Sequence, residues 1–211
     1  MQEPGKNENG DTQNFNPEEV KQMEVGLKFN LFNGKLKSTM SYYNIDIDNA
    51  ILRYRGANGA YQKQDGKVDS NGFEFDIIAN PFSGFNIVAG YTYNNAKNTK
   101  SSAISSDGKQ LVLSPRTVAN IWASYKFSRG KIKGLGIGFG ANHMSQIFEA
   151  RSVTNAFWAK PFTTLDGTIF YQKNQYRIGV KLNNITDKKY YNGYGIPQRP
   201  FNAVVALTYK L

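Results

Sequence analysis

Side chains that could support catalysis are scarce in this sequence. His143 is the only histidine, and the chain has no cysteine. A thiol nucleophile, a disulfide framework and a metal site built from several histidines or cysteines are therefore excluded. A Ser-His-Asp triad would have to use His143, which falls at the end of an expected strand. We interpret His143 as a surface or loop residue, and we expect no metal site and no cofactor.

Two carboxylates, Glu74 and Asp76, lie two residues apart in the segment FEFDI. On a β-strand this spacing places both side chains on the same face. Paired carboxylates carry out glycoside hydrolysis, which is one interpretation of the pair. The other is that both line a wet wall and pair with neighbouring lysine and arginine, and we favour it.

The glycine-rich stretch GLGIGFG (134–140) superficially resembles a nucleotide-binding loop. No helical pattern follows it, and glycines at every second position are typical of a strand. The formal net charge of +10 could suggest nucleic acid. Its lysines are scattered among Asn, Gly, Ser and Tyr, however, and do not form a basic stripe. We expect neither a phosphate site nor nucleic-acid binding.

The elements that must position these residues are predicted to be strands throughout. Apolar and polar residues alternate in nine segments, no segment has a convincing helical period, and no apolar run approaches the roughly 18 residues of a membrane helix. The predicted strands span about 20–32, 35–50, 67–79, 84–96, 117–127, 134–149, 162–172, 175–184 and 200–211. The sequence thus predicts an all-β chain.

Short and long connections alternate strictly between these strands. The short ones are Asn33-Gly34, which favours a type I′ hairpin, and segments 80–84, 128–133 and 173–175. The long, polar ones are about 51–66, 97–116, 150–161 and 185–199. An antiparallel up-and-down sheet with short turns at one end and long loops at the other is typical of transmembrane β-barrels. A soluble sandwich more often mixes loop lengths and uses crossing connections.

The two faces of each predicted strand differ in chemistry. One face reads Val25-Leu27-Phe29-Leu31 in the first strand and Tyr176-Ile178-Val180-Leu182 in the eighth, with no group ionised at neutral pH. A lipid-facing Arg or Lys at the bilayer midplane costs roughly 2–4 kcal/mol, which explains this exclusion. The opposite face is polar and rich in glycine, so we expect a large, wet lumen. Its predicted wall residues include Glu74, Asp76, Asn120 and Lys181.

Aromatic residues gather near the strand ends beside the short turns. Strands are rich in Tyr and Phe in general, but this position favours a girdle at the membrane interface. The residues concerned are Phe32, Phe82, Phe85, Phe127, Tyr171, Tyr176 and Tyr209.

The order and spacing of several segments resemble the C-terminal part of TonB-dependent outer-membrane receptors, in the siderophore-receptor branch. These segments are GFEFDIIANPFSGFNIVAGYTYNNAK (72–97), LSPRTVANIWASYKF (113–127), LGIGFGANH (135–143), VKLNNITDKKYYN (180–192) and GIPQRPFNAVVALTYKL (195–211). Segment 16–49 is similar to the hairpin that precedes them in the family.

The resemblance implies a barrel of about 22 strands, closed by an N-terminal plug, in the outer membrane of a Gram-negative bacterium. It also implies uptake of a ferric siderophore or related metal chelate, driven by the TonB complex through an N-terminal part. Candidate ligand-binding residues in the expected outer loops are His143, Arg151, Trp158, Tyr190, Tyr191, Tyr194 and Arg199. Arg and aromatic side chains suit an anionic aromatic chelate, although contact with lipopolysaccharide or ordinary loop chemistry would use them equally well.

About nine strands is too few for that barrel, and an odd number does not close a bacterial single-chain barrel. We therefore expect residues 20–211 to be the C-terminal portion of the barrel, without the plug, and residues 1–19 to be an extracellular loop or an arbitrary start. Any export signal would lie upstream of Met1, because the first residues are polar and acidic. A complementary barrel or plug chain is an alternative source of the rest. A small self-contained porin and a phospholipase-type outer-membrane enzyme stay open as other functions.

Overall fold

A computed structural model describes residues 4–56, 59–100, 110–150 and 156–210 of the 211-residue chain. These residues form strands joined by turns and loops. Alternating side chains rich in β-branched and aromatic residues favour extended backbone, and Gly, Asn and Pro at the connections favour turns. Within these ranges, no helix is long and apolar enough to cross a membrane.

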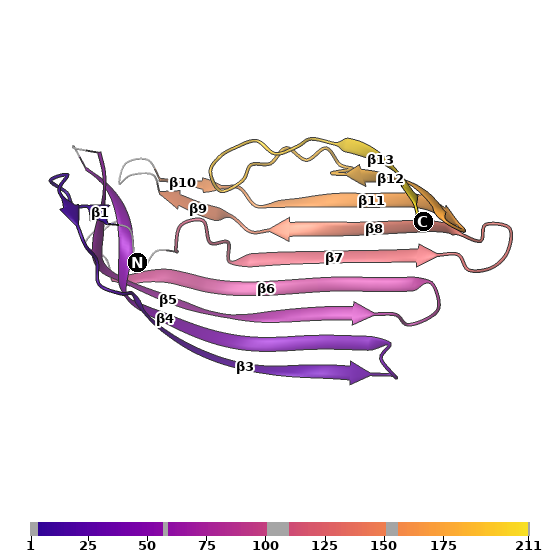
Figure 1. Ribbon diagram of the computed structural model, residues 1–211, viewed down its shortest axis with the longest axis horizontal. Helices are drawn as coiled ribbons and strands as arrows, with labels where there is room; N and C mark the ends of the chain where they lie inside the picture. Colours follow the sequence, from indigo (N-terminus) through magenta and orange to yellow (C-terminus); the bar gives the residue numbers. More distant parts are fainter. Residues whose placement is uncertain (1–3, 57–58, 101–109, 151–155, 211) are drawn as a thin grey trace.

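Nine strands form one antiparallel sheet, which Figure 1 shows as a curved wall. Neighbours in the wall follow one another along the chain, with the small β9–β10 hairpin inserted between β8 and β11. The wall strands are β3 (Glu19–Leu31), β4 (Leu36–Gly56), β5 (Gly59–Ala79), β6 (Phe85–Lys100), β7 (Thr117–Lys126), β8 (Leu135–Met144), β11 (Phe162–Lys173), β12 (Tyr176–Asn183) and β13 (Asn202–Tyr209). The predicted antiparallel, up-and-down order is confirmed, and β3 and β13 are the edges of the described sheet.

Two of the predicted long connections contain further strands. Segment 51–66 was expected to be a loop, but β4 and β5 stay paired as far as Gly56↔Gly59, beyond a register shift at Ala50. Polar residues and glycines interrupt the apolar alternation in the sequence of segment 51–66, so the sequence does not show the pattern of a half-buried strand. The strand expected at about 134–149 instead divides, because β8 ends at Met144. The following β9 (Ile147–Ala150) pairs with β10 (Ala156–Ala159), which lies in the expected connection 150–161; each is only four residues long.

The segment before β3 folds back against the outer half of β5. A small hairpin, β1 (Gly5–Lys6) with β2 (Thr12–Gln13), precedes it. Asn16 and Gln64 bond reciprocally: the Asn16 N–H donates to Gln64 Oε1 at 2.8 Å, and Gln64 Nε2 donates to the Asn16 carbonyl at 2.6 Å. The Ile51 N–H donates to Glu18 Oε1 at 2.7 Å. These contacts hold residues 5–18 on the outer hairpin; the expected boundary at residue 19 stays a prediction.

Most of the apolar face of the wall is uncovered in the described residues, although the Ile185 side chain lies over Gly167. Val205 and Leu207 on β13 are 69% and 72% exposed. The buried apolar side chains instead lie beyond the wall's central band, toward the long connections: Ala50, Val68, Ala96, Ile147, Phe148 and Ala159. A sheet without a dry core needs lipid on its apolar face, because water would oppose so much exposed hydrocarbon.

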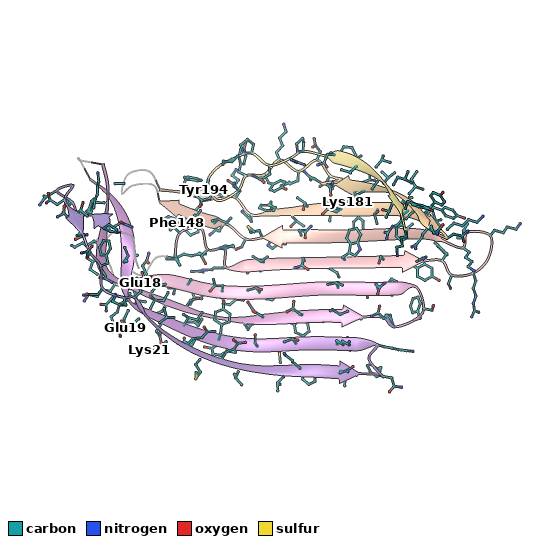
Figure 2. The ribbon with its side chains drawn as sticks, viewed as in Figure 1. Glu18, Glu19, Lys21, Phe148, Lys181 and Tyr194 are labelled. Atoms are coloured by element: carbon teal, nitrogen blue, oxygen red, sulfur yellow. The ribbon has the colours of Figure 1, made fainter. Side chains whose placement is uncertain are left out.

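A row of charges marks where the apolar band ends. Lys21, Asp46, Asp69 and Lys97 are successive register partners across β3, β4, β5 and β6. They lie on the same face as Val25, so this face changes from apolar to charged along one line. Lys21 and Glu19 are seen at the outer end of β3 in Figure 2. The segment of β3 between this row and the short turn matches the roughly 9–11 residues with which a strand spans a bilayer.

Aromatic rings cluster at the opposite, short-turn end. Phe82 stacks on Phe85 at 5.0 Å between ring centroids, Tyr125 meets Phe127 edge-on at 4.8 Å, and Tyr176 lies 4.9 Å from Tyr209 across β12 and β13. Such amphipathic rings suit the headgroup region of a membrane. Their predicted gathering beside the short turns is confirmed.

Candidate functional site

Flat aromatic side chains cover the glycines on the polar face of the wall. A Cβ on Gly138 would lie 2.7 Å from Cζ2 of Trp122, and one on Gly140 would also meet the indole. The ring of Phe170 covers Gly136 in the same way. Because the rings lie against backbone that has no side chain, they take up little of the space in front of the wall. The polar face is therefore open enough to hold another molecule or polypeptide.

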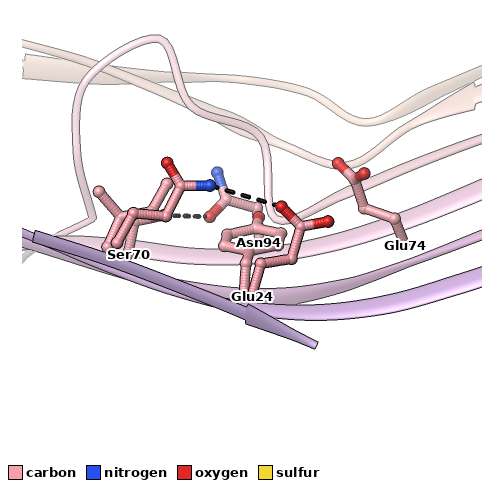
Figure 3. A pocket seen from close by; sticks show the side chains of 7 residues that line it. Glu24, Ser70, Glu74 and Asn94 are labelled. Atoms are coloured by element: carbon pink, nitrogen blue, oxygen red, sulfur yellow. Dashed lines mark hydrogen bonds between the residues drawn. The ribbon is translucent and has the colours of Figure 1, made fainter. Parts of the chain in front are cut away.

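An acidic hollow of about 340 Å³ occupies this face across β3 to β6. Figure 3 shows Glu24 and Glu74 at its rim with Ser70 and Asn94 beside them. The Ser70 hydroxyl donates to Asn94 Oδ1 at 2.8 Å, and Asn94 Nδ2 donates to the Ser114 hydroxyl at 3.0 Å. No ion pair involves either glutamate among the described residues, so the hollow is suited to cationic groups.

The predicted wall residues Asp76 and Asn120 converge on Gly90. A Cβ there would lie 3.0 Å from Asp76 Oδ1 and 3.1 Å from Asn120 Nδ2. The glycine thus leaves room for two polar groups from β5 and β7 on the polar face. Glu74 shares that face with Asp76, as the two-residue spacing predicts.

A second hollow, of about 400 Å³, is positively charged and lies on β11, β12 and β13. The predicted wall residue Lys181 lines it, together with Arg177 and Lys210, and its lining contains no carboxylate. The adjoining hollow adds Lys126, whose Nζ donates to Gln172 Oε1 at 3.1 Å. The wall therefore offers cationic groups at its C-terminal side and carboxylates at its N-terminal side.

An ion pair joins the outer parts of β4 and β5, beyond the apolar band. Lys67 Nζ lies 2.5 Å from Asp48 Oδ1. The hydrogen bond from Lys67 lowers the pKa of the Asp48 carboxyl, and the same bond raises the pKa of Lys67. Both groups are accessible to solvent, so this pair contributes modestly and is screened by salt.

Three outer connections pack into one unit, which we name the loop knob: residues 111–116, the β9–β10 hairpin and residues 185–201. Ile147 and Phe148 are buried, and Phe148 lies 4.9 Å from Trp158 between ring centroids. The Leu113 N–H donates to the Phe148 carbonyl at 2.8 Å. A Cβ on Gly193 would lie 2.7 Å from the Leu113 side chain. The knob therefore has a small apolar core of its own.

Most of the predicted ligand-binding residues lie in this knob. Trp158, Tyr191 and Tyr194 are about half exposed, at 47%, 51% and 54%. Tyr190 instead packs on Phe162 at 4.3 Å between ring centroids, so it supports the knob. Arg199 is exposed, and its carbonyl accepts a hydrogen bond from Asn184 Nδ2 at 3.3 Å. Arg151 lies outside the described residues.

His143 is not in an outer loop, so that part of the prediction is wrong. It belongs to β8, opposite Ala119 and Thr163, on the same face as the apolar Phe139 and Ala141. Its Nδ1 lies 2.9 Å from the Thr163 hydroxyl. The alternation of β8 continues through residue 143, which turns the ring away from the polar face.

Sequence reasoning missed Asn184, the most fully hydrogen-bonded side chain at the base of the knob. It is 3% exposed, with positive φ of 51°. Asn tolerates this left-handed conformation better than most residues and bonds to nearby backbone there. The segment NNITD after β12 carries that signal, because Asn and Asp directly after a strand favour a structured turn.

The arrangement is suited to binding. In the part of the chain that the structure describes, no group of three or more His, Cys, Asp or Glu side chains is placed to hold a metal ion. What the molecule presents is a wall with two oppositely charged hollows and a knob with exposed aromatic and cationic groups. Such features are suited to recognising a ligand through charge, hydrogen bonds and ring stacking.

Comparison with known proteins gives a consistent result. The family model described as "TonB dependent receptor-like, beta-barrel" matches residues 2–185. The metal-pseudopaline receptor CntO of Pseudomonas aeruginosa is 27% identical over 200 residues, covering 92% of this chain and 28% of that protein. The ferrioxamine B receptor of Salmonella typhimurium is 27% identical over 188 residues, covering 87% of this chain and 26% of that protein.

Solved structures agree on the fold. The siderophore receptor PiuA from Acinetobacter baumannii superposes with a TM-score of 0.78 at 23% identity, covering 92% of this chain and 29% of that one. The chain thus spans little more than a quarter of the length of the curated relatives it matches.

Proposed function

The chain belongs to the TonB-dependent receptor β-barrel family, and from that premise we propose that it contributes wall and outer loops to a receptor that takes up a ferric siderophore or related metal chelate. Its location is the outer membrane of a Gram-negative bacterium. The strands described above are then the C-terminal part of a barrel of about 22 strands.

The observation that carries this proposal is the loop knob above an open, polar wall. Between residues 188 and 199 the chain has Lys188, Lys189 and Arg199 and no acidic residue. Tyr191 and Tyr194 are exposed in the same segment. Cationic and aromatic groups complement an anionic, ring-bearing metal chelate through charge-assisted hydrogen bonds, cation–π contacts and stacking.

The roles of the parts follow from their chemistry. The apolar face contacts lipid, and the charged row above it is suited to lipopolysaccharide headgroups. The polar face, with its two hollows, borders the lumen and would contact a plug supplied by the rest of the receptor or by a complementary chain. The TonB complex would act on that plug. No covalent step is required of this chain, and the family consists of transport receptors, so we propose that it is not an enzyme.

Uptake assays test this function directly. The ligands named for similar receptors, namely iron-loaded ferrioxamine B, ferrichrome and pyoverdine and a metal complex of pseudopaline, would be offered to cells with and without the gene. We expect loss of energy-dependent uptake of at least one chelate on deletion, with uptake also abolished by a proton uncoupler. Unchanged uptake of every chelate, with reduced permeability to small solutes, would favour the small-porin alternative.

A further inference from the structure

The last connection of the wall, residues 184–201, is held at both ends by side-chain hydrogen bonds to backbone. Asn184 Oδ1 accepts from the Lys188 N–H at 2.8 Å, while its Nδ2 donates to the carbonyls of Lys188 at 2.9 Å and Arg199 at 3.3 Å. One buried side chain thus ties the start of the connection to its end. At the same place Asp187 Oδ1 accepts from the Phe201 N–H at 2.8 Å.

We call these side-chain hydrogen bonds of Asn184 and Asp187 the clamp. The clamp is fixed to the wall through Asp166 on β11. Asp166 Oδ1 accepts from the Asn184 N–H at 2.8 Å, and its Oδ2 accepts from Asn142 Nδ2 at 2.9 Å. The Ile185 N–H adds a bond to the Leu165 carbonyl at 2.7 Å. The connection is therefore anchored to β11 and β8, which are rigid parts of the sheet.

The far end of the connection is ordered as well. Asn192 Oδ1 accepts from the N–H groups of Tyr194 and Ile196, each at 3.0 Å, and the Gln198 N–H donates to the Tyr190 carbonyl at 3.0 Å. The tip meets the β9–β10 hairpin: a Cβ on Gly193 would lie 3.2 Å from the Ile147 side chain, and one on Gly195 3.5 Å from the Phe157 ring. Tyr194 and Phe148 are labelled in Figure 2. Tyr191, Tyr194 and Ile196 are each more than half exposed, although the N–H groups of Tyr194 and Ile196 are hydrogen-bonded and Tyr191 forms a β-bridge with Pro197.

We propose that Asn184 and Asp187 are positioning residues that preform the recognition surface of the knob, so that Tyr191 and Tyr194 are in place before a ligand arrives. The class of ligand, an anionic aromatic metal chelate, rests on the proposed function. The ordering of the loop rests on the hydrogen bonds alone. A surface ordered in advance binds more tightly because the loop entropy is not lost on binding. Asn184 and Asp187 touch no ligand in this scheme.

Asn184→Gly is the sharpest test, because glycine accepts a φ of 51° and removes only the side-chain bonds. Asn183→Ala is the matched control, because Nδ2 of Asn183 donates to Asn202 Oδ1 at 2.8 Å between β12 and β13 and the side chain is no part of the bonds made by Asn184. In the outer-membrane protein as cells make it, hydrogen exchange of peptides spanning 188–201 should become about tenfold faster in Asn184→Gly and stay unchanged in Asn183→Ala. Equal loop exchange in wild type and Asn184→Gly would overturn the clamp.

The second pair of variants keeps the test valid if Asn184→Gly fails to assemble. Asp187→Gly should accelerate exchange of the Phe201 amide, whereas Asp187→Asn keeps an Oδ1 acceptor and should restore slow exchange. If the Phe201 amide exchanges at the same rate in Asp187→Gly and Asp187→Asn, the proposed clamp is wrong.

A transport readout separates positioning from mere stability. With iron-loaded ferrioxamine B as the probe, or whichever chelate of the panel is taken up, Asn184→Gly should raise the half-saturating concentration about tenfold and leave the maximal rate per receptor unchanged, as expected for lost pre-organisation. A lower maximal rate with an unchanged half-saturating concentration would refute positioning. If the wild-type protein takes up none of the panel, the proposed function fails, while the exchange experiment still decides whether the clamp exists.

Discussion

The guanidinium carbon of Arg177 on β12 lies 4.0 Å from the ring centroid of Phe170 on β11. That ring in turn occupies the space in front of Gly136 on β8. Three adjacent strands thus share one flat stack of guanidinium, ring and bare backbone on the polar face. A cation over an aromatic face is worth about 0.5–1 kcal/mol at exposed sites, so the stack adds modest stability and keeps the lumen side clear.

We expect Gly136→Leu to force the Phe170 ring off the wall and to break its contact with Arg177. Overpacking of this kind costs about 1–3 kcal/mol, which should appear as a lower temperature of barrel unfolding on heat-modifiability gels. The double variant Gly136→Leu with Phe170→Ala should recover part of the loss, because the clashing ring is gone. An unchanged unfolding temperature in the single variant would show that the stack does not contribute to stability.

Charge on the lipid face should block assembly. Val180→Arg places a cation on the apolar face of β12, at a cost of roughly 2–4 kcal/mol near the bilayer midplane. Lys181→Arg, one residue along the strand, is the matched control because it keeps the existing charge on the polar face. The amount of folded protein in outer membranes should fall for Val180→Arg alone. Equal defects in the two variants would contradict the assignment of the faces.

The outer half of the β4–β5 hairpin should loosen at both extremes of pH. The pKa of Asp48 is lowered by its bond with Lys67, so its contribution is present at neutral pH and is lost as the pH falls through that lowered pKa. The pKa of Lys67 is raised, so its contribution is also present at neutral pH and is lost as the pH rises through the raised pKa. Proteolysis of segment 48–67 should therefore be slowest near neutral pH and low salt.

Asp48→Asn tests this origin of the pH dependence. The variant should be cleaved faster at neutral pH and should lose the acid-side change, while the rest of the wall stays resistant. A pH profile identical to that of the wild type would assign the titration to other groups.

The wall was predictable because the bilayer imposes a strict rule on one face of each strand. Alternation such as Tyr176-Ile178-Val180-Leu182 fixes which face meets lipid, and the register partners on β11 and β13 follow the same parity. The polar residues Glu74, Asp76, Asn120 and Lys181 lie on the opposite face of the sheet, and their role as a lumen wall stays a prediction. His143 was named as an outer-loop residue although the strand expected at about 134–149 already contained it, and its parity in β8 places it on the apolar face.

The knob was only partly predictable because its order depends on contacts between segments distant in sequence. Tyr190 looked like a ligand contact, but Phe162, far away in the chain, packs against it. Asn184 looked like an ordinary loop asparagine, and its role depends on Asp166, 18 positions earlier. No local period encodes such pairings, so composition could suggest the binding chemistry of the loop but could not show which side chains support it.

The edges of the wall give the last prediction. β3 and β13 each have a partner on one side only in the described sheet, and the apolar Val205 and Leu207 place β13 at hydrocarbon depth. Each unsatisfied backbone N–H or C=O there costs several kcal/mol, because lipid offers no partner. We expect the purified 211-residue chain in detergent to self-associate through these strands, or to capture a polypeptide that supplies further barrel strands. Light scattering after size-exclusion chromatography would measure the mass of the assembly. Planar-bilayer recordings would show whether the chain conducts ions. A monodisperse single chain that inserts and conducts ions would contradict the open wall and support a small self-contained porin.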